Sequence, residues 1–222
     1  MTASSSSPSL DLLPASLPEA SSDPDTFPPD TQESRLIRRA QGGDTGAFRI
    51  LVELHEDMIF RVCHQWLALE EDAREACQDT FIKAWQALPA WQPRARLSTW
   101  LYQIALNQCR DRARSRAYRQ RQATTNFDQL TATPACPHAS PDLAAVRRDD
   151  MLKLQQGLAA LPAASREILI LCAMEGLSYQ EAALVLKCSP RAIEGRLYRA
   201  RQLLLTWWNK AGPKPRAAPP RH

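Results

Sequence analysis

The sequence predicts an all-α protein with two helical domains joined by a flexible linker. Apolar residues recur at spacings of three and four along most of the chain, and no segment has a convincing alternating strand pattern. The chain has 222 residues, which is enough for one or two small domains. Residues 122–139 are rich in Thr, Ala, Pro and Asn and interrupt the helical pattern, which indicates the linker.

The two ends of the chain differ in composition from its middle. Residues 1–34 contain nine Ser, six Pro and six acidic residues but no Lys or Arg, so we expect residues 1–33 to be a disordered acidic tail. Residues 35–222 hold 28 basic and 18 acidic side chains, a formal charge of +10 against +4 for the whole chain. This excess favours a polyanionic partner. Residues 211–222 form a basic, Pro-rich tail.

The first domain, residues 34–121, is predicted to be a compact helical bundle. A short helix is expected from Leu36 to Gln41, and an apolar helix face runs from Phe48 to Trp66. The next helix is expected to bury Ile82 and Trp85 on one face. The last three helices are expected to begin at Asp44, Asp72 and Ser98.

The last helix of this domain changes from apolar to basic along its length. Six Arg and one Asp fall within Arg110 to Arg121, a composition suited to DNA phosphates. The loop before it joins Trp91 to Arg94 and Arg96, a mixture that can hold an unstacked base and its strand. A solvated helix end and core packing of Trp91 are the alternatives.

The second domain, residues 140–210, is predicted to end in a helix-turn-helix. Ser178 and Glu181 have capping-box spacing at the start of one short helix. Ser189 and Pro190 open a second helix, which ends at Arg199–Arg201 and keeps a basic outer face. An ordinary helical hairpin with a solvated basic face is the alternative.

Two further positions define the surroundings of this motif. The preceding helix is expected from about Pro162 through Glu175, with Gly176 in the left-handed position that ends it. Lys187 stands at the turn where a glycine would be easiest. The turn therefore either strains Lys187 or takes another shape.

Nothing in the sequence predicts an enzyme, a cofactor or a metal site. Phosphate-loop, nucleophile and metal-ligand motifs are missing, so we expect binding without catalysis. The six Cys residues are scattered singly, and most are expected to be buried; only Cys136, near His138 in the linker, leaves a redox or metal role open. Neither a signal peptide nor an apolar span of about 18 residues is present, so no membrane insertion and a cytoplasmic location are expected.

Four motifs follow one another in residues 35–206, and together they resemble the signatures of sigma-70 family RNA polymerase sigma factors of the extracytoplasmic-function (ECF) type. The motifs are Asp72–Trp85, Trp100–Asn107, Leu161–Glu167 and Leu177–Arg201. The resemblance implies a sigma-two domain at residues 34–121 and a sigma-four domain at residues 140–210, without a sigma-three domain. It implies a factor that binds bacterial core RNA polymerase and directs promoter recognition and transcription initiation.

The resemblance also assigns roles to residues. The residues expected to bind core polymerase are Asp72, Gln78, Asp79, Phe81 and Lys83. Contacts with the -10 element are expected from Trp91, Arg94, Arg96, Ser98, Asn107, Arg110 and Arg114. Contacts with the -35 element are expected from Ser178, Pro190, Arg191, Glu194, Gly195, Arg196 and Arg199. Members of the family are commonly silenced by an anti-sigma factor, so such a partner is expected here.

Some residues depart from the family pattern. Arg74 stands where an acidic residue is usual, Arg191-Ala192 replaces Gly-Thr, and Glu194 replaces a basic residue. Promoter preference therefore does not transfer from a relative; Glu194 is suited to a cytosine amino group and Arg191 to guanine. Two other classes of protein remain as alternatives. A duplex-DNA regulator would not need the Gln78-Asp79 pair, and a protein-interaction adaptor would show little salt-dependent DNA binding.

Overall fold

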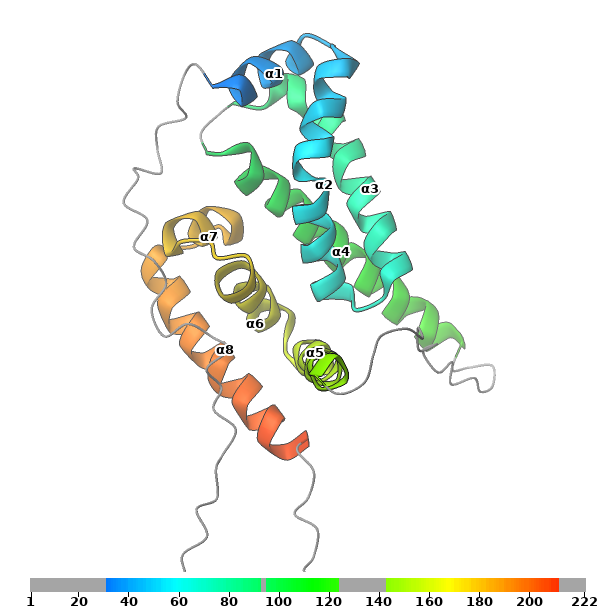
Figure 1. Ribbon diagram of the computed structural model, residues 1–222, viewed down its shortest axis with the longest axis vertical. Helices are drawn as coiled ribbons and strands as arrows, with labels where there is room; N and C mark the ends of the chain where they lie inside the picture. Colours follow the sequence, from blue (N-terminus) through cyan, green and yellow to red (C-terminus); the bar gives the residue numbers. More distant parts are fainter. Residues whose placement is uncertain (1–30, 93–94, 124–142, 212–222) are drawn as a thin grey trace, which may run out of the picture.

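The protein is described by a computed structural model covering residues 31–92, 95–123 and 143–211 (Figure 1). Within these ranges the secondary structure is helical, with no strand, so the all-α prediction is confirmed. The elements are α1 (Gln32–Gln41), α2 (Thr45–Leu67), α3 (Glu70–Ala87), the 3-10 turn η1 (Leu88–Ala90), α4 (Leu97–Ala123), α5 (Leu143–Ala160), α6 (Ala163–Ile168), the π-helical η2 (Leu169–Met174), α7 (Tyr179–Leu186) and α8 (Pro190–Ala211).

Most of both tails and of the expected linker lies outside the described residues, as do Arg94, Cys136 and His138. At the start of the described chain, the disorder expected through residue 33 is wrong for its last residues. Thr31 caps α1 by accepting a hydrogen bond from the Ser34 N–H at 3.2 Å. The predicted start of the linker at residue 122 is likewise two residues too early, because α4 continues through Ala123.

The first domain, α1 to α4, is a bundle around an apolar core. The buried side chains of α2 include Leu51, Ile59 and Trp66, as its sequence pattern predicts. The Asp44 carboxylate accepts from the Ala47 N–H at 3.0 Å, which confirms the predicted start of the helix. Four Cys residues of the described chain are buried and Cys188 is half-buried, which confirms their predicted role as small apolar residues.

Two predictions for α3 are wrong. The helix begins at Glu70 rather than after Asp72, because Ala68 takes a left-handed conformation with φ 63° and the chain turns directly into α3. The Asp72 carboxylate instead pairs with Arg116 of α4 at 3.2 Å. Ile82 was expected to be buried but is 48% exposed, because it lines an open groove between α2 and α3.

The second domain, α5 to α8, contains the predicted helix-turn-helix. The Ser178 hydroxyl accepts from the Glu181 N–H at 3.2 Å, and the Glu181 carboxylate accepts from the Ser178 N–H at 3.0 Å. The capping box is therefore confirmed. Ser189 caps α8 by accepting from the Ala192 N–H at 3.3 Å. Lys187 has φ 50°, so of the two alternatives for the turn the structure has the strained left-handed one.

The segment before the helix-turn-helix also departs from a simple α-helix. Gly176 has φ 72°, the predicted left-handed conformation. The helix expected from Pro162 through Glu175 is divided into α6 and the wider η2. In η2 the Glu175 N–H donates to the carbonyl of Ile170 at 2.9 Å, a spacing of five residues that defines a π-helical turn.

α8 is longer than the sequence predicts. It continues to Ala211 rather than ending at Arg201. Its later turns pack on α5 at Gly157, where an added Cβ would lie 2.8 Å from Leu204 and 2.9 Å from Trp207. This close approach supplies the burial that keeps the additional turns helical.

The two domains lie against each other (Figure 1). α4 contacts α7, while α2 contacts α5 and η2. The sequence gives no indication of this contact, because it depends on side chains far apart in the chain. Among the described residues, no helix is both long enough and apolar enough to span a membrane.

Candidate binding surfaces

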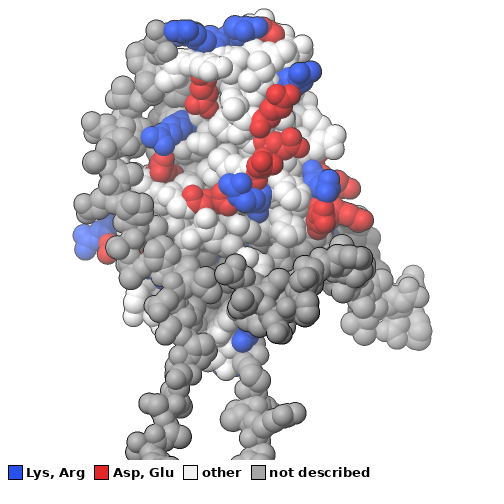
Figure 2. Space-filling model, in the orientation of Figure 1, with Lys and Arg blue, Asp and Glu red and all other residues white. Residues whose placement is uncertain are grey.

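An open groove of about 830 Å³ lies between α2 and α3. Its apolar lining comes from both helices and comprises Phe48, Val52, Phe60, Phe81, Ile82 and Trp85. Glu56, Asp57, Arg74 and Gln78 supply polar groups around these side chains. Figure 2 shows acidic side chains over α2 and α3, with some basic ones among them, and mainly basic side chains over α1. The groove is therefore suited to an apolar segment that carries basic residues.

The five residues predicted to bind core polymerase do not lie on one surface. Gln78 and Phe81 line the groove. Asp79 accepts a 2.7 Å hydrogen bond from Arg112 of α4, and Asp72 pairs with Arg116 of the same helix, so both carboxylates hold α3 to α4. Lys83 lines a different pocket.

No groove residue of α2 was predicted as a site residue, and three of those missed are large apolar side chains: Phe48, Val52 and Phe60. Their spacing at i, i+4 and i+12 places them on one helix face, which in the sequence is indistinguishable from a fully buried face. In the structure α3 packs beside these side chains without covering them completely, so they are only partly buried.

Arg110 of α4, predicted to contact the -10 element, is bound to the second domain. Its Nε and Nη2 donate to the two carboxylate oxygens of Glu167 in α6, each at 2.7 Å. Nη1 donates to the Asn107 amide oxygen at 2.7 Å. Glu167 is 4% exposed, and its hydrogen bonds raise the pKa of the Arg110 guanidinium above its usual range.

Two more ion pairs cross between the domains. Arg96 Nη1 lies 3.5 Å from Glu181 Oε1. Arg61 Nη2 lies 3.2 Å from Glu175 Oε2, a contact that raises the pKa of Arg61. In all three pairs the first domain contributes the guanidinium and the second the carboxylate, so the two faces are complementary in charge.

Neutral groups complete this interface. The Gln103 amide donates to the Leu184 carbonyl at 2.8 Å, and the Tyr102 hydroxyl donates to Glu175 at 3.4 Å. Ser98, predicted to contact the -10 element, and the cap Ser178 line a cavity of about 300 Å³ between the domains. Ser98 and Ser178 are thus brought together although the sequence assigns them to different DNA elements.

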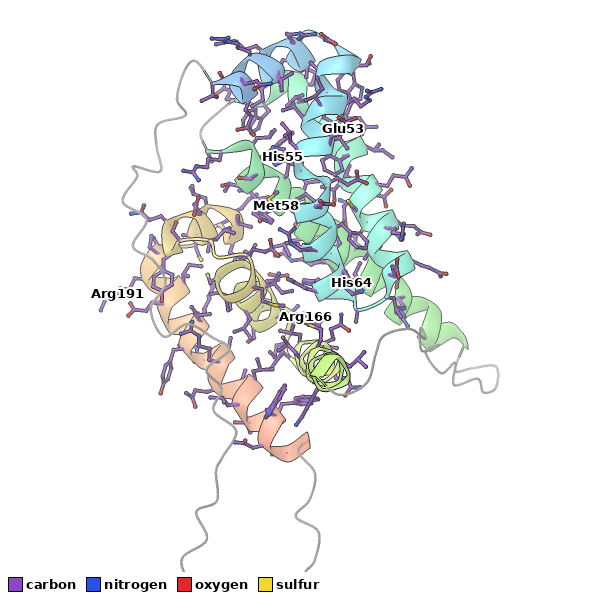
Figure 3. All side chains as sticks on the ribbon, viewed as in Figure 1. Glu53, His55, Met58, His64, Arg166 and Arg191 are labelled. Carbon is purple, nitrogen blue, oxygen red and sulfur yellow. The ribbon has the colours of Figure 1, made fainter. Side chains whose placement is uncertain are left out.

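Arg166 of α6 joins three helices. Its guanidinium donates to the carbonyls of Leu158 and Ala159 at the end of α5, at 2.8 and 2.7 Å. It also donates to the carbonyl of Trp66 in α2 at 2.9 Å and lies 4.7 Å from the centre of the Trp66 ring. Burial lowers the pKa of this guanidinium. Figure 3 shows Arg166 close to α5 and below the end of α2.

The remaining -10 candidates differ in their surroundings. Trp91 packs against Trp100 with ring centres 5.2 Å apart, and its carbonyl accepts from Gln41 at 2.8 Å. Trp91 is therefore partly a packing residue. Arg114 is exposed and lies 3.3 Å from Asp111.

The -35 candidates gather on the outer side of α8. Arg191, Glu194, Arg196 and Arg199 are exposed, with Gly195 among them. Arg191 points away from the first domain (Figure 3). Arg191, Glu194, Gly195 and Arg199 share a shallow pocket of about 550 Å³ with Tyr198, which is 67% exposed and was not predicted. Tyr198 follows Glu194 by four residues and therefore lies on the same face of α8, a spacing from which the sequence could have predicted it as a site residue.

Comparison with known proteins identifies both domains. Residues 51–119 match the family model of sigma-70 region 2, and residues 151–204 match that of sigma-70 region 4. RNA polymerase sigma factor NccH of Alcaligenes xylosoxydans xylosoxydans is 36% identical over 173 residues, which cover 78% of this chain and 92% of NccH. The chain belongs to the sigma-70 family of RNA polymerase sigma factors.

Further relatives place it in the ECF group of that family. ECF RNA polymerase sigma factor SigW of Bacillus subtilis is 26% identical over 178 residues, 77% of this chain and 93% of SigW. The solved structure of CnrH in complex with the cytosolic domain of CnrY covers 80% of this chain and 97% of that chain, with a TM-score of 0.60 and 29% identity. As an ECF sigma factor, the protein binds RNA polymerase and directs transcription initiation at promoters.

Proposed function

We propose that this ECF sigma factor binds core polymerase through the α2/α3 groove and recognises promoters with α4 and α8, after its two domains separate. In this proposal α1 to α4 act as sigma-two and α5 to α8 as sigma-four. The observation that carries it is the groove, whose apolar lining includes Phe81 beside Gln78. A DNA-binding regulator that never contacts polymerase would have no use for such a surface.

The groove is suited to a helical segment of core polymerase. Apolar side chains on both walls provide buried area, and further exposed acidic residues of α2 and α3 favour a basic partner: Glu53, Glu56, Asp57, Glu70 and Glu75. Arg74 lies within the groove lining and pairs with Glu70 at 2.6 Å. Arg74 stands where the family usually has an acidic residue, and its charge within the groove is neutralised by Glu70.

Promoter binding requires the domain interface to open. Arg96 and Arg110 are expected to contact -10 DNA, yet both are paired with carboxylates of the second domain. In each pair the carboxylate binds the guanidinium group that would otherwise bind a DNA phosphate. In the open form these arginines become available to the -10 strand, while α8 binds the -35 duplex.

Two further aspects of the function rest on the same proposal. The protein acts by binding, without a reaction of its own, in the cytoplasm where polymerase works. The relative CnrH has been solved with the cytosolic domain of CnrY, and we propose that this chain also has an anti-sigma partner. Such a partner would silence the factor by stabilising the closed arrangement, in which the two domains lie against each other as in this structure.

In vitro transcription with sigma-free bacterial core polymerase and a pool of genomic promoters tests the function. The wild-type protein should produce discrete start sites, which weaken for Gln78→Ala/Ile82→Ala, two groove residues with exposed side chains. Glu71→Gln, an exposed α3 change outside the groove, is the matched control and should transcribe normally. Asp79→Ala is unsuitable because it also breaks the contact with Arg112. Binding to duplex fragments without any transcript would support the regulator instead.

A further inference from the structure

We infer that Lys83 contacts a phosphate of the single-stranded -10 region and is not part of the polymerase docking surface. The inference rests on the proposed function and revises the role that the family resemblance gives to this residue. It follows from the position of Lys83 on α3 and from the residues that share its pocket.

Lys83 lies on a different side of α3 from the groove. One residue of an α-helix corresponds to a rotation of about 100°, so Lys83 is about 160° from Phe81 around the helix axis. Phe81 and Gln78 line the α2/α3 groove. Lys83 lines a separate pocket of about 430 Å³ between α3 and α4, together with Ala87 one turn later.

The α4 side of this pocket carries groups that suit single-stranded DNA. They are Trp100, Ile104, Asn107, Gln108, Arg110, Asp111 and Arg114. Three of them, Asn107, Arg110 and Arg114, are among the residues of α4 already expected to contact the -10 element. Aromatic, amide and guanidinium groups beside one another are typical of surfaces that follow a single strand.

The charge around Lys83 favours a phosphate. The lining holds three cations, Lys83, Arg110 and Arg114, but one anion, Asp111. Asp111 is paired with Arg114 at 3.3 Å. Lys83 is exposed, and among the described residues no hydrogen bond or ion pair engages its ammonium group. Arg110 is held by Glu167 while the domains are closed. When the domains separate, Lys83 and Arg110 are two neighbouring cations without a carboxylate partner, and an additional negative charge matches them best.

Lysine is suited to a contact that is independent of sequence. An ammonium group is a point charge with freely rotating donors, which fits a phosphate better than a particular base edge. Lys83 would therefore contribute to affinity and register on the strand, while base preference would come from other residues.

The salt dependence of the promoter complex tests the inference with full-length protein and core polymerase. Each phosphate contact to a single strand contributes a slope of about 0.7 in log affinity against log salt concentration. Lys83→Ala should reduce the slope by about this amount and weaken the complex about fourfold at 0.15 M salt, equally for all promoters. Lys83→Arg should preserve the slope.

Binding of labelled sigma factor to core polymerase supplies the second readout. Lys83→Ala should bind core polymerase as the wild type does, whereas Ile82→Ala, which removes an exposed side chain of the groove, should bind more weakly. An unchanged salt slope together with weakened core binding would overturn the inference and return Lys83 to the docking surface, with the proposed function intact. If the wild type itself neither binds core polymerase nor forms a promoter complex, the proposed function fails first.

Discussion

The Arg110 guanidinium of α4 and the buried Glu167 carboxylate of α6 form a two-point contact across the domain interface, with both N–O distances at 2.7 Å. Arg110 is a candidate for DNA binding in the first domain, and Glu167 belongs to the second. The pair therefore links the arrangement of the domains to the availability of the -10 surface. In the closed arrangement Glu167 competes with DNA for Arg110.

Glu167→Gln should increase binding of the free protein to a single-stranded -10 oligonucleotide. The amide keeps the shape of the carboxylate but removes the charge that holds Arg110, a loss of about 1 kcal/mol or about fivefold in the closing equilibrium. Fluorescence anisotropy measures the affinity. Glu75→Gln, which alters a contact of Arg112 within the first domain, is the control and should leave it unchanged. Equal affinities for Glu167→Gln and the wild type would argue against competition.

Substitution of two glycines should change stability in opposite directions. Gly157→Ala places a Cβ 2.8 Å from Leu204, so we expect a loss of about 1 to 3 kcal/mol. At Gly195 in α8 the nearest atom to an added Cβ is Arg199 Nη1 at 3.6 Å. Gly195→Ala should therefore gain up to about 1 kcal/mol from helix propensity. Chemical denaturation measures both, and a stabilised Gly157→Ala variant would show that α8 does not pack closely on α5.

Stability should decline in alkaline solution in part because of Cys172. Burial raises the pKa of its thiol from 9.0 to about 11. The unfolded thiol therefore ionises first, and the stabilising contribution of the folded thiol, complete below pH 9, is lost as pH rises through 11. Between pH 8 and pH 10 the free energy of unfolding should fall less steeply for Cys172→Ala than for the wild type. Parallel declines would mean that this thiol titrates alike in both states.

Two exposed arginines of α8 should affect promoter binding differently. Arg191→Ala should relax the preference at one base pair of the -35 element, at a cost of about 1 to 3 kcal/mol, because a guanidinium can donate two hydrogen bonds to guanine. Arg196→Ala should weaken binding uniformly, as expected for a phosphate contact. Binding to a library of -35 variants separates the two effects. A uniform loss for Arg191→Ala would assign that residue to the phosphates as well.

The sequence could predict those features that depend on neighbouring residues. The capping box of Ser178 and Glu181, the cap at Asp44 and the left-handed Gly176 are all local. The cap assigned to Asp72 failed because the chain reverses at Ala68 and starts α3 earlier.

Features that depend on packing between distant segments could not be predicted. The sequence does not show that Asp79 faces Arg112 or that Lys83 lies opposite Asn107 across a pocket. It likewise gives no sign that Arg110 meets Glu167, 57 positions further along the chain. These contacts determine which of the predicted site residues are available in the closed form.

Energy transfer between two dyes tests most directly whether the closed arrangement withholds Arg110 until polymerase and promoter bind. The dyes would be attached at Glu71 in α3 and Gln202 in α8, both exposed, through unnatural amino acids that leave the native Cys residues unmodified. We predict high transfer in the free protein, lower transfer for Glu167→Gln, and a large decrease when core polymerase and promoter DNA are added. High transfer that persists in a transcribing complex would contradict the account, because the domains would then act without separating.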